Sequence, residues 1–464
     1  MNLVIKNAQV ITMDRDRTVL KDGAIIIEGS TIKKVCPSES LDADLSGYEI
    51  YDAQGCTALP GLVNTHTHLF QGLWKGLGDD RVLIDWFQKV TGPSSAVLEP
   101  EDCYLAAQLG ALESIRSGAT CLLDFMYPHH QAGLSEPIIK ALGASGLRAV
   151  FARGFIDYGE NSGVPPAVIE KAEDALTDIE QLFEKYNGGF DGRMQVWMAP
   201  CMIWSQTEQG LRQARELSRA KKIPVTIHVA ETPFELENAL ERFGKKDLEY
   251  LESIDFLGPD LLAVHCVYLD ERDLRILKHY DIKVSHNPTS NMYLSSGVAP
   301  IPQMLLAGIT VGLATDGPAS NNNQNMLSVL KMTALLHKVS TKDPTVLTAE
   351  KVLEMATIDG ARALGLQEET GSLEAGKKAD LIIADLHTPF TRPVLHPVST
   401  LVYSALGDEV KTMLVGGEFV MRDGKVLTLD EEEVLQQIQQ RAEDLMARAN
   451  TQCFSQRPWR SQAF

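Results

Sequence analysis

The chain has 464 residues, enough for a barrel-sized domain and a smaller one, and its 44% of hydrophobic and 23% of charged residues are ordinary values for a folded globular protein. Its 62 acidic and 43 basic residues give a formal net charge of −19, which repels phosphate backbones and anionic lipids. We therefore expect neither a nucleic acid nor a membrane as a partner.

The cysteines indicate a reducing compartment. They are odd in number, lie far apart, and form no Cys-x-x-Cys pair, and most stand in apolar runs such as TCLLDF and AVHCVY, where a buried reduced thiol is expected. The first residues, MNLVIKNAQVITMD, alternate and lack the apolar stretch of a signal peptide, and no run approaches the roughly 18 apolar residues of a membrane span. We expect a cytoplasmic protein. The seven cysteines are Cys36, Cys56, Cys103, Cys121, Cys201, Cys266 and Cys453.

Both ends of the chain predict short strands. Residues 1–57 contain NLVIKNAQVITM, GAIIIEGSTIKKV and YEIYDAQGC, which turn residues such as Asp-Gly and Glu-Gly separate, as in a small antiparallel sheet. The same texture returns after residue 370, in GSLEAGKKADLIIADL and VKTMLVGGEFVMRDGKVL. We predict one composite β-sandwich domain, built from residues 1–57 and 366–464.

The middle of the chain, residues 58–365, alternates short apolar runs with segments of helical periodicity. Eight strands that alternate with helices predict an α/β protein with a parallel (β/α)₈ TIM barrel. A doubly wound open sheet is the alternative, and it is disfavoured because no Gly-x-Gly-x-x-Gly turn follows the early strands. The predicted strands are 56–64, 119–125, 148–155, 194–200, 223–231, 261–268, 282–288 and 310–317.

A last helix is predicted at 430–450, DEEEVLQQIQQRAEDLMARAN, with acidic residues in the first turn, where the helix dipole favours them. This helix packs either on the body of the protein or on a partner subunit, and the sequence leaves both open. We expect a homo-oligomer.

Metal-competent side chains follow the predicted barrel strands. In PGLVNTHTHLF, His66 and His68 stand two residues apart, so both point to one face of the strand end. His228, His265 and Asp316 stand at the ends of three later strands, and the carboxyl ends of barrel strands carry the active site. Each alone is more typical of a core histidine or a turn aspartate, but together they predict a metal centre.

Imidazole nitrogens with one carboxylate suit a single divalent ion such as Zn²⁺ or Fe²⁺, which lowers the pKa of a bound water towards about 7 and so supplies hydroxide. Hydrolysis also needs a proton carrier. Glu231 follows His228 by three residues and could carry that proton, although a helix-capping or surface glutamate is the alternative in AETPFELE.

An ordered set of motifs along nearly the whole chain resembles the amidohydrolase superfamily, in its branch of heterocyclic deaminases and s-triazine hydrolases. The motifs are PGLVNTHTHLF, HVAE, AVHC, SHNPTSNMYLSSGVAPI, ATDGPASNN and VLEMATIDGARALG followed by GSLEAGKKADLIIADL. The resemblance implies a (β/α)₈ barrel, a flanking β-sandwich and one divalent metal. It also implies attack at an amine-bearing ring carbon with loss of ammonia, or, in sibling enzymes, loss of chloride.

By matching motifs, the resemblance implies that His66, His68, His228 and Asp316 are metal ligands. It implies that Glu231 protonates a ring nitrogen, that His265 positions the nucleophile and substrate, and that Asp316 also accepts the proton of the water. Matching positions that would line the substrate pocket, where each side chain could instead serve packing or a turn, are Gln71, Trp86, Phe155, Asn291 and Ser320.

The sequence defines the heterocyclic ring of the substrate less well than it defines the reaction. AVHCVYLDERDLRILKHYDIKV and the C-terminal segment look most similar to the s-triazine enzymes, yet Gly317 stands where those relatives carry a polar residue. Deaminases of methylthioadenosine and S-adenosylhomocysteine are similar through SHNPTSN and DGPASNN. Such enzymes hold the ribose with a glutamate after the tryptophan and a histidine after the fourth strand, and DWFQKVTGPSSAV and APCMIWSQT contain neither. That counts against a nucleoside.

We therefore expect a metal-dependent hydrolytic deaminase of an s-triazine or a purine- or pyrimidine-like ring. The alternatives are an s-triazine chlorohydrolase and a methylthioadenosine/S-adenosylhomocysteine deaminase. A two-metal amide hydrolase is disfavoured because WMAPC lacks a lysine that could bridge the metals. A metal-free scaffold is disfavoured because it would have no chemical need for all six centre residues.

Overall fold

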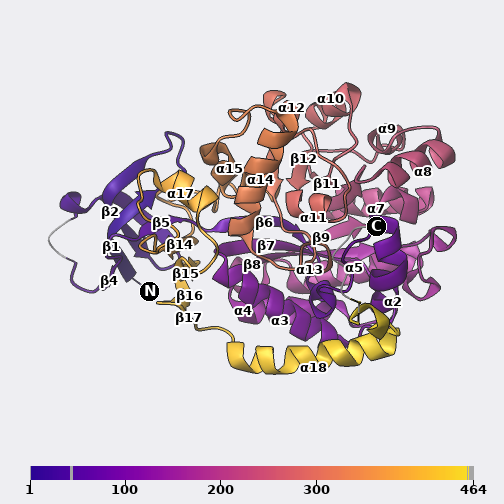
Figure 1. The fold of residues 1–464 in the computed structure, drawn as a ribbon, viewed down its shortest axis with the longest axis horizontal. Helices are drawn as coiled ribbons and strands as arrows, with labels where there is room; N and C mark the ends of the chain where they lie inside the picture. The colour runs from indigo at the N-terminus through magenta and orange to yellow at the C-terminus, as the bar shows by residue number, and fades with distance from the viewer. Residues whose placement is uncertain (1, 42–44, 457, 459–464) are drawn as a thin grey trace.

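Eight parallel strands form the centre of the larger part of the molecule (Figure 1). The computed structural model describes residues 2–41, 45–456 and 458. The two outermost strands of this sheet meet, because the Asp316 amide donates to the His66 carbonyl at 3.1 Å and Thr65 Oγ1 donates to the Leu313 carbonyl at 3.1 Å. The sheet is therefore a barrel, as predicted. In spatial order its strands are β6 (Leu62–Thr67), β7 (Ala119–Met126), β8 (Arg148–Phe155), β9 (Met194–Pro200), β10 (Val225–Val229), β11 (Leu261–His265), β12 (Lys283–His286) and β13 (Val311–Leu313).

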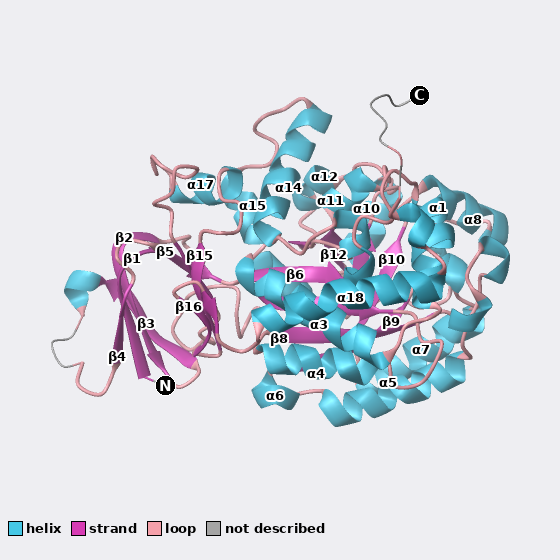
Figure 2. Ribbon diagram, turned by 60° about the horizontal axis from the view of Figure 1, so that its bottom comes forward, coloured by secondary structure: helices cyan, strands magenta, loops and turns pink. Residues whose placement is uncertain are grey.

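Helices surround the barrel, as Figure 2 shows. Every residue of β7 and β8 is buried, because helices cover the outer face and side chains fill the interior. The longer helices are α3 (Pro100–Arg116), α4 (Ser135–Ser145), α5 (Ala172–Tyr186), α7 (Glu208–Lys221), α8 (Pro233–Phe243), α10 (Glu271–His279), α14 (Met326–Thr341) and α18 (Glu431–Ala449). The shorter ones are α1 (Leu83–Trp86), α2 (Gly92–Ser95), α6 (Gly189–Gly192), α9 (Asp247–Ser253), α11 (Pro288–Tyr293), α12 (Ile301–Leu306), α13 (Pro318–Asn321), α15 (Ala349–Met355), α16 (Ile358–Ala363) and α17 (Pro397–Tyr403).

A separate nine-stranded mixed sheet combines strands from both ends of the chain. The expected antiparallel pattern is only partly correct, since β1 pairs in parallel with β4 and β5. The β1–β2 and β2–β3 pairs are antiparallel as expected, whereas β4 and β5 run in the same direction as β1. The strands are β1 (Asn2–Ile11), β2 (Val19–Glu28), β3 (Thr31–Pro37), β4 (Glu49–Asp52), β5 (Thr57–Pro60), β14 (Leu381–Ala384), β15 (Val410–Val415), β16 (Glu418–Arg422) and β17 (Lys425–Val426).

The first predicted barrel strand, 56–64, is in fact two strands. Its first half is β5 of the mixed sheet, and its second half begins β6 of the barrel. The chain changes sheet at Gly61, where a Cβ would lie 2.0 Å from Thr120 Oγ1, so only glycine allows this close approach to β7. The predicted domain limits, 1–57 with 366–464 and 58–365, stay a prediction, and residues 1, 42–44, 457 and 459–464 lie outside the described part.

The C-terminal helix packs on the body of the protein, which is the first of the two alternatives left by the sequence. Figure 1 shows α18 lying along α3. The fully buried carboxylate of Asp102 accepts from Arg441 Nε at 2.5 Å and from Arg448 Nη2 at 2.8 Å. Asp430 caps the first turn by accepting from the Glu433 amide. No helix of the described residues is long and apolar enough to cross a bilayer.

Candidate active site

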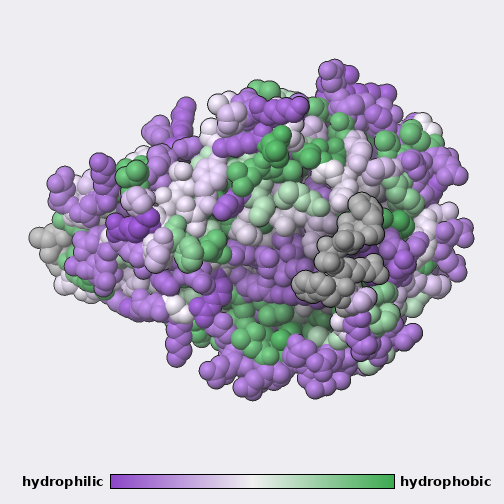
Figure 3. Space-filling view, in the orientation of Figure 1, coloured by the Kyte–Doolittle hydropathy of each residue, from purple (hydrophilic) through white to green (hydrophobic). Residues whose placement is uncertain are grey.

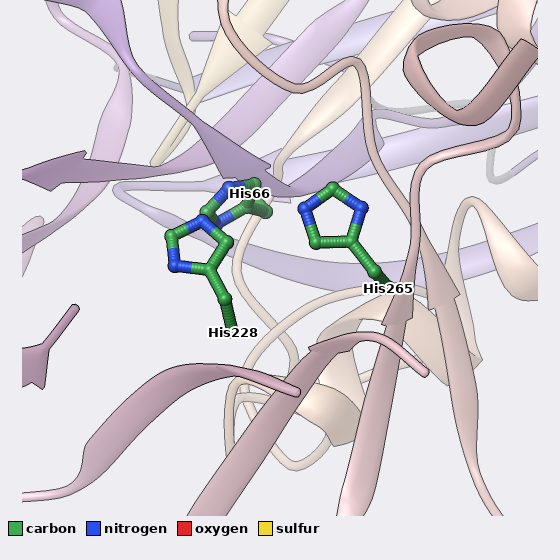
Figure 4. A group of neighbouring side chains, drawn as sticks. All are labelled: His66, His228 and His265. Atoms are coloured by element: carbon green, nitrogen blue, oxygen red, sulfur yellow. The ribbon is translucent and has the colours of Figure 1, made fainter. Parts of the chain in front are cut away.

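The strand ends bring the predicted metal ligands together. His66 Nε2 lies 3.2 Å from His68 Nε2 and 3.4 Å from Asp316 Oδ1, and His228 Nε2 lies 3.3 Å from His68 Nε2. Ligand atoms at about 2.0–2.2 Å from a tetrahedral cation would be about 3.3–3.6 Å apart, so these separations suit one ion. Figure 4 shows His66, His228 and His265 pointing toward a common space.

In His68 and His228, a hydrogen bond at Nδ1 leaves Nε2, the nitrogen that faces the other ligands, with a free lone pair. His68 Nδ1 bonds the Phe125 carbonyl at 2.6 Å, and His228 Nδ1 bonds the Cys201 carbonyl at 2.7 Å. A carbonyl only accepts, so the proton is on Nδ1 and the Nε2 of each ring is free to bind a cation. The donor set therefore fits one divalent metal.

Burial and mutual charge control the ionisation of this cluster. Burial, together with neighbouring His66, lowers the pKa of His68 to about 3, so the ring is neutral. Burial alone would raise the pKa of Asp316, but the hydrogen bond to His66 and the neighbouring imidazoles hold it well below its usual value. The centre therefore offers neutral imidazoles and an ionised carboxylate.

Backbone geometry turns two of these side chains inward. His265 has φ 68° and Asp316 has φ 61°, values that residues other than glycine rarely adopt. His265 is the last residue of β11, and Asp316 follows the end of β13 by three residues. The surrounding hydrogen bonds, such as that from the Asp316 amide to the His66 carbonyl, hold this conformation.

Glu231 and His265 stand side by side at the edge of the cluster. Glu231 Oε2 lies 3.5 Å from His265 Nε2, and Ser296 Oγ donates to Glu231 Oε1 at 3.0 Å. Burial, and then the charge of Asp316, raise the pKa of Glu231 to about 8. A carboxyl that keeps its proton at neutral pH inside a site can act as a general acid.

The five predicted substrate-binding residues divide into two groups. Gln71, Trp86 and Ser320 line the cavity that opens at the cluster. Phe155 and Asn291 are absent from that lining: Phe155 is fully buried in β8, and Asn291 Oδ1 lies 2.9 Å from His265 Nδ1 and orients that ring. All five roles stay predictions, and for Asn291 the geometry favours a role through His265.

The remaining lining is mostly apolar. Among the residues that line this cavity in the described structure, the only carboxylates are Glu231 and Asp316, both of them at the centre. Gly317 packs against the lining, because a Cβ there would lie 2.0 Å from Gln71 Oε1, so a polar side chain at 317 would displace Gln71. Further lining residues are Leu83, Ile84, Phe87, Tyr127, Met202, Trp204 and Leu294.

Sequence reasoning did not identify Glu235, which links the proposed proton donor to the pocket wall. Its Oε2 accepts from the amides of Glu231 at 2.5 Å and Thr232 at 3.1 Å, and its Oε1 accepts from Trp204 Nε1 at 3.3 Å. Thr232 with Glu235 forms a capping box at the start of α8. The Thr-x-x-Glu spacing was the available signal, but it indicates a helix start and nothing about Trp204.

Comparison with known proteins identifies relatives along nearly the whole chain. Residues 57–420 match the model of the amidohydrolase family. The chain is 41% identical over 449 residues to a 5'-deoxyadenosine deaminase of Methanosarcina acetivorans, covering 97% of this chain and 99% of that one. It is 37% identical over 437 residues to a 5-methylthioadenosine/S-adenosylhomocysteine deaminase of Syntrophobacter fumaroxidans, covering 94% and 97%.

Solved structures show the same fold. An adenosine deaminase from Xanthomonas campestris with bound zinc has a TM-score of 0.89 at 26% identity, covering 96% of this chain and 99% of that one. An atrazine chlorohydrolase from Arthrobacter aurescens TC1 with zinc has a TM-score of 0.89 at 24% identity, covering 95% and 100%, which shows the fold alone.

These relatives confirm the predicted activity, the hydrolytic deamination of an aminated nitrogen heterocycle, and give its s-triazine version less direct support. They also confirm the resemblance that the motifs indicated. With a family match over residues 57–420 and relatives of 41% identity, the chain belongs to the amidohydrolase family.

Proposed function

We propose that the chain removes the 6-amino group of a 5'-modified adenosine, such as 5'-deoxyadenosine or methylthioadenosine, by hydrolysis. The observation that carries the chemistry is Glu231, a buried carboxyl with its pKa raised to about 8, beside His265 and next to the histidine cluster. The names of the relatives at 41% and 37% identity support the nucleoside.

The residues of the centre would share the work as follows. His66, His68, His228 and Asp316 would hold one divalent ion, Zn²⁺ or Fe²⁺. That ion, when bound, supplies the Lewis acidity that makes water nucleophilic near neutral pH. The ionised carboxylate of Asp316 would accept a proton of the attacking water, since its pKa is held well below the usual value.

Glu231 would deliver a proton to the ring nitrogen next to the carbon under attack, because burial keeps it protonated at neutral pH. His265 would orient water and substrate, with its ring held by Asn291. Once the ring nitrogen is protonated, the tetrahedral carbon can expel the amino group as ammonia after a second proton transfer. Glu231 and Asp316, the two carboxyl groups among the described lining residues, would make these transfers.

A second candidate is deamination of a free aminated ring, an s-triazine or a nucleobase. What favours it is the cavity lining, which in the described structure has no carboxylate beyond Glu231 and Asp316 that could bind a ribose diol. The glutamate and histidine that would hold a ribose are also missing from the expected segments. Phe87 and Gln88 follow Trp86, and Cys201 and Met202 follow β9.

The deciding experiment measures ammonia release by the metal-replete protein from 5'-deoxyadenosine, methylthioadenosine, S-adenosylhomocysteine, adenine, guanine and melamine, with chloride release from atrazine alongside. The first two should react best. S-adenosylhomocysteine should react at least about tenfold less well, because its charged tail would enter an apolar cavity. Ammonia from free bases or melamine alone would establish the second candidate, and no product from any compound would refute both.

We also propose a cytoplasmic homo-oligomer. The seven cysteines are all free thiols, as a reducing compartment requires. Figure 3 shows a hydrophobic area in the region of α14, where Met332, Leu335 and Val339 are 39%, 44% and 73% exposed. Apolar side chains gathered on one helix are typical of a covered face. Sedimentation velocity tests this proposal, which a monomer at micromolar concentration would refute.

A further inference from the structure

A second group of metal-competent side chains lies on the mixed sheet, away from the barrel centre. Cys56, Asp385 and His387 each offer a ligand atom, and the three atoms lie within 4.8 Å of one another. We call these three residues the junction triad. They meet because β5 and β14 pair antiparallel with Thr57 opposite Ala384, which places the next residues outward, Cys56 and Asp385, beside each other.

Hydrogen bonds fix the geometry of the junction triad. Asp385 Oδ1 lies 2.8 Å from His387 Nδ1 and accepts from the His387 amide at 2.8 Å. A histidine that donates one ring N–H to a carboxylate presents the other nitrogen as a lone pair, which is the usual arrangement of a metal-binding imidazole. The Cys56 amide donates to the Ala53 carbonyl at 2.8 Å and holds the turn that carries the thiol.

The backbone leaves room for the imidazole next to the thiol. Gly55 has φ 81°, and a Cβ there would lie 3.8 Å from His387 Cε1 and 4.0 Å from Nε2. The ring therefore packs over a glycine turn immediately before Cys56. Cys56 is half-buried and His387 is exposed, so an ion and a water can reach the group from solvent.

Sulfur, imidazole and carboxylate together are a donor set that zinc prefers, and three protein ligands leave a fourth position for water. Because zinc binds a cysteine as the thiolate, an ion must displace the thiol proton of Cys56, and binding strengthens as the pH rises.

We propose that the junction triad is a second divalent-cation site of this protein, with a donor set suited to zinc, whose role is structural. The ion would join Cys56, before β5, to Asp385 and His387, after β14, and so connect strands from the two ends of the chain. It would stabilise the mixed sheet without taking part in deamination. No cysteine lies among the proposed ligands of the barrel centre. A spectroscopic signal of metal–thiolate coordination would therefore report on the junction triad and not on the barrel centre.

The test replaces zinc by Co²⁺ in the full-length protein and records the near-ultraviolet band of cobalt–thiolate charge transfer. We expect the wild-type protein to bind two equivalents and to show this band. Cys56→Ser should lose the band, bind one equivalent, lose only the part of the increase in Tm that the second equivalent of zinc causes, and keep deaminase activity within about twofold. The control Cys453→Ser, at an exposed thiol, should behave as wild type.

His387→Ala provides a second variant that retains the thiol and changes an exposed side chain. It should weaken cobalt binding at the junction triad by at least about tenfold and leave the other equivalent in place. A wild-type protein with one equivalent and no thiolate band would overturn the proposal, and so would a band that survives in Cys56→Ser. Neither readout depends on turnover, so the result is independent of whether the proposed substrate is correct.

Discussion

Glu231 is the side chain on which the proposed chemistry most directly depends. Glu231→Gln preserves its shape and its hydrogen bond to Ser296 but cannot deliver a proton. We expect kcat to fall at least about a hundredfold, the usual contribution of a general acid, with metal content unchanged and Tm not lowered. Glu237→Gln, on the exposed face of α8, is the matched control. Full activity of Glu231→Gln, measured as ammonia release, would remove Glu231 from the mechanism.

The raised pKa of Glu231 predicts a pH dependence of both rate and stability. Burial, and then the charge of Asp316, place the pKa at about 8, so kcat should decline as the pH rises through 8 and the acid form disappears. Between pH 4.5 and about 8, Glu231 is protonated in the folded state and ionised in the unfolded chain. Its contribution to the free energy of unfolding therefore falls as the pH rises from 4.5 to about 8. A flat rate between pH 6 and 10 would contradict this assignment, and Glu231→Gln should lose less stability than wild type over the same range.

Glu235 is expected to act as a positioning residue through Glu231 and Trp204. Glu235→Gln replaces one acceptor oxygen by an NH₂ group, which would oppose the N–H groups of Glu231 and Thr232 or that of Trp204 and so displace these neighbours. Because a displacement of about 1 Å can cost about a hundredfold in rate, we expect kcat to fall between tenfold and a hundredfold. Trp204→Phe, which loses only the N–H, should mainly raise KM. A lower Tm with kcat and KM unchanged would show a merely structural role for Glu235.

At the scale of elements, α18 depends on one buried carboxylate. Asp102 is fully buried and pairs with Arg441 and Arg448 of α18, and its Oδ2 also accepts the Glu99 amide that begins α3. Asp102→Ala should lower the free energy of unfolding by about 1.5–3 kcal/mol, because it removes the buried partner that two guanidinium groups share and leaves them only the more exposed carboxylates of Glu99 and Glu101. Urea denaturation gives the value, and limited proteolysis should show release of α18.

The control for Asp102 is its neighbour Glu101, which is exposed and reaches Arg441 at 3.3 Å. Glu101→Gln should change the free energy of unfolding by less than about 1 kcal/mol, as is usual for surface ion pairs. If both substitutions had equally small effects, α18 would be held by its apolar contacts and the ion pairs would be incidental.

Some elements could be predicted from sequence and others could not. Helical periodicity between apolar runs is a local property, so eight barrel strands and the last helix were predictable, and so was the convergence of His66, His228 and Asp316 at their ends. The change of sheet at Gly61 was missed because β5 and β6 form one continuous apolar run. The parallel pairing of β1 with β5 depends on contacts far apart in sequence, which local patterns do not encode.

The candidate site shows the same division between local and distant information. Residue type and position at strand ends were enough to assemble the cluster and Glu231. The lining residues Leu83, Met202 and Leu294 lie at the start of α1 and in connections between elements, and nothing in their local sequence indicates that the assembled barrel brings them to the pocket. Asn291 was placed in the pocket by its motif, whereas its side chain turns to His265.

For the whole molecule, removal of metal should affect stability as well as activity. The cluster joins β6, β10 and β13, strands far apart along the chain, so an ion that binds the folded state alone stabilises it. Treatment with a chelator should abolish deamination and lower Tm by several degrees, and one equivalent of Zn²⁺ or Fe²⁺ should restore activity. Unchanged turnover of the metal-free protein would refute the proposed centre.

The meeting of the first and last barrel strands also sets a time course for making this protein. His66 and Asp316 lie on opposite sides of that meeting point and are 316 − 66 = 250 residues apart. At about 5–20 residues per second, a ribosome needs roughly 12–50 s to extend the chain from one ligand to the other. During that interval the His66–His68 pair is an incomplete chelator on a growing chain, so loading of the centre must follow synthesis of nearly the whole barrel.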